Sequence, residues 1–379
     1  MKVIVAMDSY KGCLSSAQAN SAVKRGILRV DENIDVVSFL CGDGGEGTMD
    51  AFMSACNGER MEVEVQDAYR NKIVSSYGII ENGNTAVIEV GKVIGLTMRE
   101  KQDRHPMYAS SYGVGEMLAH ALKKGCKKII LALGGSSTND GGMGLLEAIG
   151  VRFYDENHKC LKAMPKNLEK IAYIDKRKML DFSNVECIAA CDVKNHLLGE
   201  NGATYVFGPQ KGLYPNQLKR VEKGMIHYCE RMKKVGYDLN RSEGGGAAGG
   251  IGSVFIEVLH AKMMSGVDLL FSYNHIEESI FDCNLVITGE GQSDLQSAYG
   301  KLPVGVLNIA KKYHKPCICI SGALGVDYKK LYDLGFAGIY SIADRPMNYK
   351  KALEVAEEKL EDFSYSIVKT IQTFRGDKL

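Results

Sequence analysis

The sequence lacks several features that would place it in a common functional class at once. It contains no tryptophan, and its 47 lysines and arginines nearly balance its 46 aspartates and glutamates, giving a net charge of +1. A chain with so little net charge has no global positive field to attract a nucleic acid or an anionic membrane, and tryptophan is a common residue for stacking on bases. Neither a nucleic acid nor an anionic membrane is therefore an expected partner. No run approaches the ~18 apolar residues of a membrane span. The first apolar run, Val3–Ala6, is too short for a signal peptide.

The cysteines and histidines indicate neither a disulfide framework nor a metal centre. There are eleven cysteines and no CxxC pair; the closest pairs are Cys187 with Cys191 and Cys317 with Cys319. An odd number of cysteines at such spacings is typical of reduced cytosolic thiols, so we expect a cytoplasmic protein. The eight histidines are scattered along the chain and form no metal-binding pattern.

Two catalytic signatures are also absent. The chain has no Walker A loop, which excludes a P-loop kinase, and no GxSxG nucleophile elbow. The glycine run 244–249 fits the letters GxGxxG, but it follows the polar segment 238–243 instead of a clear strand, so it is weak evidence for a dinucleotide site. Two interpretations stay open: backbone amides around Gly246 that meet a phosphate at a helix N-terminus, or tight packing of that helix.

Glycine, in contrast, is abundant, and its 42 residues gather beside acidic and hydroxyl side chains. In the segment 129–144, IILALGGSSTNDGGMG, a buried strand is expected to lead through a polar loop to a helix. Such a loop can bind an anion, because glycines let the backbone approach a ligand and the helix N-terminus offers unpaired N–H groups. A capped turn is the alternative. The candidate binding residues here are Ser136, Ser137, Thr138, Asn139 and Asp140.

The order of apolar segments predicts a two-domain α/β protein. Two strand–helix units, at 3–28 and 36–55, open the chain, and three more follow residue 284. About five parallel strands suit a flavodoxin-like, doubly wound parallel sheet. We therefore expect a discontinuous flavodoxin-like domain of residues 1–62 and 281–379.

The middle of the chain has a different pattern. Segments 61–67 and 72–90 alternate apolar and polar residues, and Asn82-Gly83 marks a hairpin turn between two strands. Antiparallel strands are expected here, followed by strands and helices of the α/β type. Residues 63–280 are therefore predicted to form an inserted α/β domain with a mixed sheet.

Acidic, hydroxyl and basic side chains follow several of the expected strands, at the edge where doubly wound sheets bind ligands. Lys11 can neutralise a phosphate or carboxylate, and Asp192 can take the proton of a substrate hydroxyl. Asp43 and Glu46 suit Mg²⁺ coordination through water, or orientation of a polyol. Capped turns and solvated side chains are the structural alternative for these positions. The remaining candidates are Asp8, Ser9, Lys211, Glu290, Asp294, Ser297 and Lys301.

Together these residues favour phosphoryl transfer, which needs positioning, Mg²⁺ and charge neutralisation more than covalent catalysis. The expected reaction is attack by a substrate alkoxide on the γ-phosphate of ATP, with a carboxylate beside the hydroxyl. Two other classes stay open: an NAD-dependent sugar-acid oxidoreductase that uses the glycine run 244–249, and a sugar-acid-binding regulator without catalysis.

The order and spacing of nine motifs resemble the glycerate kinase type 1 family across nearly the whole chain. The resemblance implies ATP-dependent phosphorylation of D-glycerate with Mg²⁺ in organic-acid catabolism, usually giving 2-phosphoglycerate, and an active site between two α/β domains. The alternatives are 3-phosphoglycerate as product, or a related small hydroxy acid as substrate. The motifs are DSYKG (8–12), GDGGEGT (42–48), SYGVGE (111–116), LGGSSTNDGG (133–142), CDVKNHLLG (191–199), FGPQKG (207–212), GGGAAGGIG (244–252), TGEGQSDLQS (288–297) and RPM (345–347).

Within this family pattern we expect Asp192 to act as the base or to orient the hydroxyl, while Lys11 and Lys211 neutralise anionic charge; Asp8 completes the catalytic set. The metal ligands are left open among Asp43, Glu46 and Glu290. Some positions depart from the family: Tyr10 and Cys13 replace a phenylalanine and a serine, His196 replaces a proline, and Gln292-Ser293 stands where Arg-Leu is usual. The sequence leaves open whether the chain is a monomer or a homo-oligomer.

Overall fold

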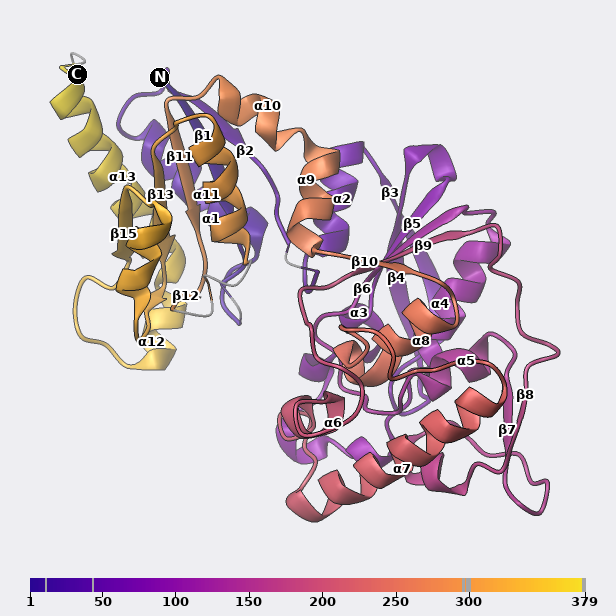
Figure 1. The fold of residues 1–379 in the computed structure, drawn as a ribbon. Helices are drawn as coiled ribbons and strands as arrows, with labels where there is room; N and C mark the ends of the chain where they lie inside the picture. The colour runs from indigo at the N-terminus through magenta and orange to yellow at the C-terminus, as the bar shows by residue number, and fades with distance from the viewer. Residues whose placement is uncertain (11, 43, 295–296, 298–300, 377–379) are drawn as a thin grey trace. The chain divides into compact units, whose positions relative to one another are not determined.

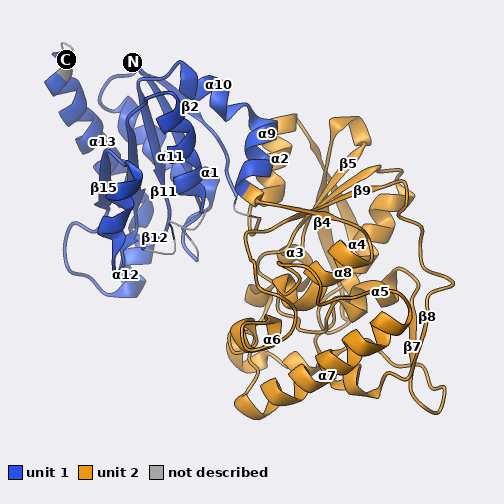
Figure 2. Ribbon diagram, viewed as in Figure 1, with its two compact units in different colours: residues 1–43, 267–379 blue, residues 44–266 orange. Residues whose placement is uncertain are grey.

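The computed structural model describes residues 1–10, 12–42, 44–294, 297 and 301–376, and for Arg375 the backbone alone. Helices and strands alternate along most of the chain (Figure 1). The chain divides into two compact units, one made of residues 1–43 and 267–379 and the other of residues 44–266 (Figure 2). We call them the first and the second unit.

The first unit contains a five-stranded parallel sheet. Its strands are β1 (Lys2–Met7), β2 (Asp35–Ser38), β11 (Leu285–Gly289), β13 (Cys317–Ser321) and β15 (Gly338–Ser341). The spatial order β2-β1-β11-β13-β15 corresponds to 2-1-3-4-5 in chain order, which is the flavodoxin-like arrangement. The predicted doubly wound sheet, assembled from both ends of the chain, is thereby confirmed.

Helices α1 (Ser16–Leu28) and α13 (Ala356–Arg375) pack against each other beside this sheet. Ser15 caps α1 in a capping box with Gln18, which satisfies backbone groups that a helix end would otherwise leave unpaired. The two helices cross closely at Gly26, where an added Cβ would lie 2.2 Å from a backbone oxygen of α13. Apolar side chains of both helices form one core with alternate residues of β1 and β11.

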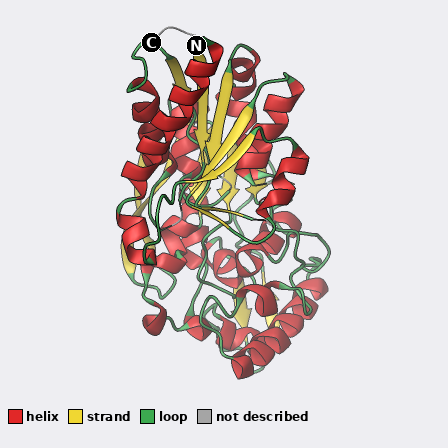
Figure 3. Ribbon diagram, turned by 90° about the vertical axis from the view of Figure 1, so that its left-hand side faces the viewer, coloured by secondary structure: helices red, strands yellow, loops and turns green. Residues whose placement is uncertain are grey.

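The first unit also contains helices that precede, connect or follow its later strands. Figure 3 distinguishes the helices, strands and loops of the whole chain by colour. Helix α11 packs on β1, β11 and β13. The bounds are α9 (Gly266–Asn274), α10 (Ile276–Phe281), α11 (Leu302–Lys312), α12 (Tyr349–Glu354), a 3₁₀ helix (Tyr328–Leu334), and the short parallel pair β12 (Gln292–Ser293) and β14 (Ala323–Leu324).

The second unit is built on a six-stranded mixed sheet in the order β10-β9-β6-β5-β4-β3. The pairs β3–β4 and β4–β5 are antiparallel, and the pairs β5–β6, β6–β9 and β9–β10 are parallel. The expected mixed sheet is therefore confirmed. The strands are β3 (Glu59–Gln66), β4 (Lys72–Ile80), β5 (Thr85–Glu89), β6 (Lys128–Ala132), β9 (Glu186–Ala190) and β10 (Lys262–Met264).

Most of the second unit's core lies between this sheet and its helices. A small antiparallel hairpin, β7 (Arg152–Tyr154) with β8 (Tyr173–Asp175), adds to it. The helices are α2 (Thr48–Cys56), α3 (Gly91–Ile94), α4 (Tyr112–Lys123), α5 (Met143–Ala148), α6 (Ala203–Phe207), α7 (Pro215–Lys234) and α8 (Ile251–Glu257), and the 3₁₀ helices are Glu81–Gly83, Leu96–Met98, Lys101–Asp103, Pro106–Tyr108, Pro165–Lys170 and Ala247–Gly250.

The chain passes from one unit to the other between residues 43 and 44 and again between residues 266 and 267. The sequence pattern placed these two boundaries near residues 62 and 281. Helix α2 belongs to the second unit because it packs on β4 and β5. Gly78 of β4 leaves room for it: an added Cβ would come within about 3 Å of methionine side chains of α2. Helix α9 packs in the first unit, where Val267 contacts Gly305 of α11.

Candidate active-site residues

Three loops meet at the carboxyl edge of the second unit's sheet. The Leu133 N–H donates to the Ala190 carbonyl at 3.3 Å, and the Gly134 N–H donates to the Gly44 carbonyl at 3.0 Å. An added Cβ on Gly134 would lie 2.5 Å from the Cα of Gly45, so the close approach requires glycine. These contacts bring together the loops that carry three predicted groups of site residues: Glu46, Ser136 to Asp140, and Asp192.

Lys211 lies under the loop that follows β6. Its Nζ donates to the Ser136 hydroxyl at 3.0 Å and to the Thr138 carbonyl at 2.7 Å, and the residue is 3% exposed. Burial lowers the pKa of this ammonium to about 7, although the nearby Asp140 carboxylate opposes the shift. Lys211 therefore supports the loop through Ser136 and Thr138, and its charge is sensitive to pH in the neutral range.

Asp140 is buried inside the loop and not open to a ligand. Its carboxylate accepts hydrogen bonds from the Ser111 N–H and hydroxyl at 2.8 and 2.9 Å, and from the N–H groups of Gly144 and Gly142 at 3.1 and 3.2 Å. Burial nevertheless raises the pKa of this carboxyl. Asp140 thus ties the start of α5 to the residues before α4, which is a structural role.

Replacing Asp140 by alanine should therefore destabilise the protein. The change leaves backbone N–H groups buried without an acceptor, and we expect a loss of about 3 kcal/mol in the free energy of unfolding. Urea denaturation followed by circular dichroism measures this loss. A variant with unchanged stability and lost activity would instead support the ligand contact that the sequence suggested.

Other polar atoms of the same loop are engaged within the second unit. The Ser137 hydroxyl donates to the Ile94 carbonyl, and the Asn139 side-chain amide donates to the Thr204 hydroxyl.

The Gly246 N–H donates to the Asn195 carbonyl at 2.9 Å, and an added Cβ there would lie 2.4 Å from the His196 carbonyl oxygen. The glycine run 244–249 is thus used for packing, and the Gly246 amide is not presented to a phosphate.

Glu89 is a residue of interest that sequence reasoning missed. It ends β5 in the same way that Asp192 follows β9, as an acid after an apolar run, so the same signal could have found it. The carboxylate accepts a hydrogen bond of 2.6 Å from the Met49 N–H at the start of α2, and the Lys92 ammonium lies 3.8 Å away. Burial raises its pKa to about 7.

A second group of site residues lies at the carboxyl edge of the first unit's sheet. The Asp8 N–H donates to the Gly289 carbonyl at 2.8 Å, which sets the end of β1 beside the end of β11. Glu290 follows β11 and is 4% exposed; the Lys301 ammonium is 3.1 Å from one carboxylate oxygen, and the Ser293 hydroxyl donates to the other at 3.0 Å.

Asp294 and Ser297 are hydrogen-bonded to each other. The Asp294 N–H donates to the Ser297 hydroxyl, and the Ser297 N–H donates to the Asp294 carbonyl. The Gln292 amide, at the position of the usual family arginine, donates to the Asp294 carboxylate at 3.1 Å. Lys11 and Asp43, which the sequence analysis also expects in the site, lie outside the residues that the structure describes.

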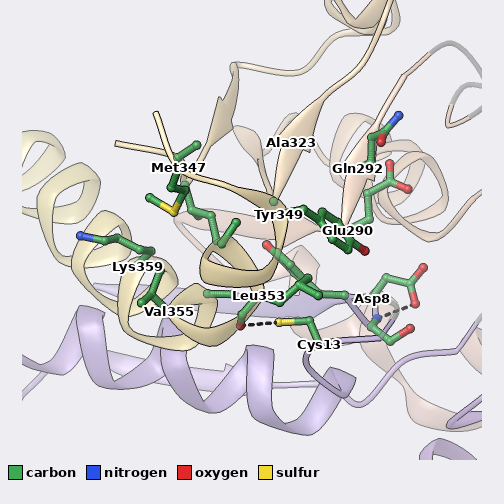
Figure 4. Close-up of a pocket in the computed structure, with 18 of the residues that line it drawn as sticks. Asp8, Cys13, Glu290, Gln292, Ala323, Met347, Tyr349, Leu353, Val355 and Lys359 are labelled. Carbon is green, nitrogen blue, oxygen red and sulfur yellow. Dashed lines mark hydrogen bonds between the residues drawn. The ribbon is translucent and has the colours of Figure 1, made fainter. Parts of the chain in front are cut away.

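A cavity of about 360 Å³ opens between these strand ends and α12. Asp8, Ser9, Glu290 and Lys301 line it, so four of the predicted site residues share one cavity. In Figure 4 the carboxylates of Asp8 and Glu290 lie toward one end, and Met347 lies toward the other. We call this space the strand-end cavity.

Two features are absent from the described part of the chain. Among those residues, no group of three or more histidine, cysteine or acidic side chains could hold a metal ion. Within the same residues, no helix combines the length and the apolar character needed to cross a membrane.

Acids, hydroxyls and lysines at the carboxyl edges of two α/β sheets are the residue types that enzymes of the phosphoryl-transfer class use. Residues 3–372 match the glycerate kinase family. The chain is 37% identical to glycerate 2-kinase of Escherichia coli K12, covering 98% of both chains, and 37% identical to a Bacillus cereus glycerate kinase, covering 95% of both. A Salmonella typhimurium LT2 structure described as a glycerate kinase 2 superposes with a TM-score of 0.84 at 34% identity over 99% of both chains. The chain therefore belongs to the glycerate kinase family, and it is a kinase that acts on glycerate.

Proposed function

We propose that the protein transfers the γ-phosphate of ATP to the 2-hydroxyl of D-glycerate and releases 2-phosphoglycerate. The observation that carries the choice of hydroxyl is the full-length similarity to the Escherichia coli protein named glycerate 2-kinase. The carboxylates of Asp8, Asp192 and Glu290 are the acidic groups that this proposal uses for the transfer.

In this proposal the second unit binds the acceptor. The glycerate carboxylate is held at the loop 134–138, where the Ser136 hydroxyl receives a hydrogen bond from Lys211 and thus has its own proton directed to the ligand. Asp192, exposed after β9, orients the 2-hydroxyl and accepts its proton as the oxygen attacks phosphorus.

The first unit binds the phosphates of the donor. Lys301, with its side chain 34% exposed, can leave Glu290 to neutralise a phosphate oxygen as a compact charge. The carboxylates of Asp8 and Glu290 line one cavity and supply the hard oxygen donors that suit Mg²⁺. When bound, Mg²⁺ offsets charge on the phosphates. Transfer between groups held by two units is the arrangement expected for an active site in an interdomain cleft.

A ³¹P NMR experiment on purified protein with Mg-ATP and D-glycerate tests the proposal. A new phosphate-ester resonance that matches 2-phosphoglycerate is the expected result, and a resonance of 3-phosphoglycerate would overturn the choice of hydroxyl. Absence of any ester under turnover conditions would contradict glycerate as the acceptor, and other small hydroxy acids would then be compared. NADH-dependent reduction of a sugar acid would favour the oxidoreductase; glycerate binding without ATP consumption would favour the regulator.

A further inference from the structure

We propose that the strand-end cavity of the first unit binds the purine nucleoside of ATP, and that the sugar-acid substrate does not enter it. This inference rests on the proposed function, because it assigns a place to the donor of that reaction. The sequence alone left open which domain holds the nucleotide.

The position of the cavity supports a nucleotide. Its walls come from the residues that follow four parallel strands: Asp8 after β1, Glu290 after β11, Gly322 after β13 and Ile342 after β15. In the sheet order 2-1-3-4-5 the direction of winding reverses between β1 and β11. Doubly wound sheets bind ligands outside the carboxyl edge at this reversal, where loops diverge and leave a crevice.

The cavity walls also differ in chemistry from one end to the other (Figure 4). Carboxylates, a hydroxyl, an amide and the Lys301 ammonium line the cavity near β1 and β11, whereas the residues from Met347 to Ala356 contribute mainly apolar groups from α12 and its flanks. Lys359 also lines the cavity at this second end, where its ammonium is paired with the Asp344 carboxylate at 2.7 Å. A ligand that complements both ends carries a charged group and a flat apolar group. Glycerate, a small and fully polar acid, would leave the apolar wall in contact with water, whereas a nucleotide would cover it.

The volume agrees with this ligand class. Small-molecule and cofactor sites enclose about 300–1,000 Å³, and the cavity measures about 360 Å³. Its polar end is also held in place: the Glu290 carboxylate is bound by Lys301 and Ser293, and the Tyr10 hydroxyl donates to the Ile320 carbonyl at 2.8 Å. The base would therefore rest on α12, and the phosphates would extend toward Lys301.

Cys13 provides an internal reporter for the cavity. The thiol lines the wall, with its Sγ 3.1 Å from the Leu353 carbonyl oxygen, and the residue is partly exposed. Cys160 is exposed and belongs to the second unit, so it serves as a control in the same sample. Alkylation of both thiols by N-ethylmaleimide at pH 8 can be followed by peptide mass spectrometry.

We expect saturating ADP or adenosine to slow the alkylation of Cys13 at least fivefold and to leave Cys160 unchanged. D-Glycerate alone should protect neither thiol. Equal protection of Cys13 by glycerate would overturn the assignment, as would normal alkylation of Cys13 in protein that is saturated with ADP.

A variant with a filled cavity tests the same point without chemical modification. Ala352 lines the cavity from α12, whereas Lys350 is exposed on the same helix and does not line it. Ala352→Phe should raise the Kd for ADP about tenfold or more in calorimetry, while Lys350→Phe and the binding of glycerate stay unchanged. If ADP binds the wild type and Ala352→Phe equally, the cavity assignment fails although the kinase reaction survives. If ADP and ATP bind neither protein, the proposed donor itself is wrong.

Discussion

Replacing Asp192 by asparagine should lower kcat for glycerate phosphorylation by a factor of about 10² to 10⁴, the usual range for loss of a general base. Asparagine has nearly the same shape, but it cannot accept the hydroxyl proton. Because Asp192 is exposed, we expect the free energy of unfolding to change by less than about 0.5 kcal/mol. A coupled assay of ADP release and a urea titration measure the two quantities.

Asp181→Asn is the matched control for this variant. Asp181 is also an exposed aspartate of the second unit, and its carboxylate accepts the Ser183 N–H in a turn before β9. Asparagine can keep that turn, so neither activity nor stability should change. If Asp192→Asn retained wild-type kcat, Asp192 would not be the base, and the buried Glu89 would become the next candidate at that sheet edge.

Replacing Lys211 by methionine should lower kcat/KM for glycerate by about 10²-fold, comparable to the loss of one preorganised hydrogen-bond donor in a binding site. Methionine fills a similar volume, but the Ser136 hydroxyl and the Thr138 carbonyl both lose the donated hydrogen bond. The effect should appear mainly in KM, because in the proposed function Lys211 acts on the bound carboxylate through Ser136. Retention of wild-type KM would contradict this positioning role.

The same lysine should make the stability of the protein depend on pH. Its pKa is about 7 in the folded protein and lies near 10.5 in an unfolded chain, so between these values the unfolded state binds more protons. The stability cost of burying Lys211 is therefore complete below pH 7 and decreases as the pH rises. From pH 7 to 9 the wild type should gain about 2 kcal/mol relative to Lys211→Met. Parallel stability curves would show that the buried amine does not titrate in this range.

The pH dependence of the KM for glycerate distinguishes this role of Lys211 from general structural damage. An anion bound beside Ser136 favours the charged form of Lys211, so binding above pH 7 takes up a proton. The KM for glycerate should rise from pH 7 to pH 9 in the wild type, and the rise should be smaller in Lys211→Met. A pH-independent KM in the wild type would exclude this coupling.

The parallel sheet of the first unit could be predicted because runs such as Val3–Ala6 and Cys317–Ser321 are short, apolar and followed by polar loops. The count of about five such strands led to the expectation of a flavodoxin-like sheet, and the structure shows the order of its strands. The limits of the units were harder to predict, because an amphipathic helix such as α2 shows that one face is covered but not which sheet covers it.

The candidate site was predictable at the level of loops more than of single residues. Ser136, Asp140 and Gly246 lie in loops at or near the sheet edges, yet the same residue types serve both ligand binding and tight turns. Asp140 proved to satisfy backbone amides from Ser111 and α5, a contact that depends on distant segments meeting in three dimensions. The burial of Lys211 likewise depends on packing that no local pattern reveals.

The split first unit has a consequence for how the chain is made. Strand β1 lies inside its sheet, between β2 and β11, and Val3 pairs with Leu285 near the opposite end of the chain. During synthesis the second unit, continuous from 44 to 266, can complete its core while the N-terminal segment still lacks its partners. The apolar β1 therefore stays without its β11 partner through most of translation, and this long-range pairing should limit the folding rate. During that time β1 is an apolar segment to which chaperones should bind.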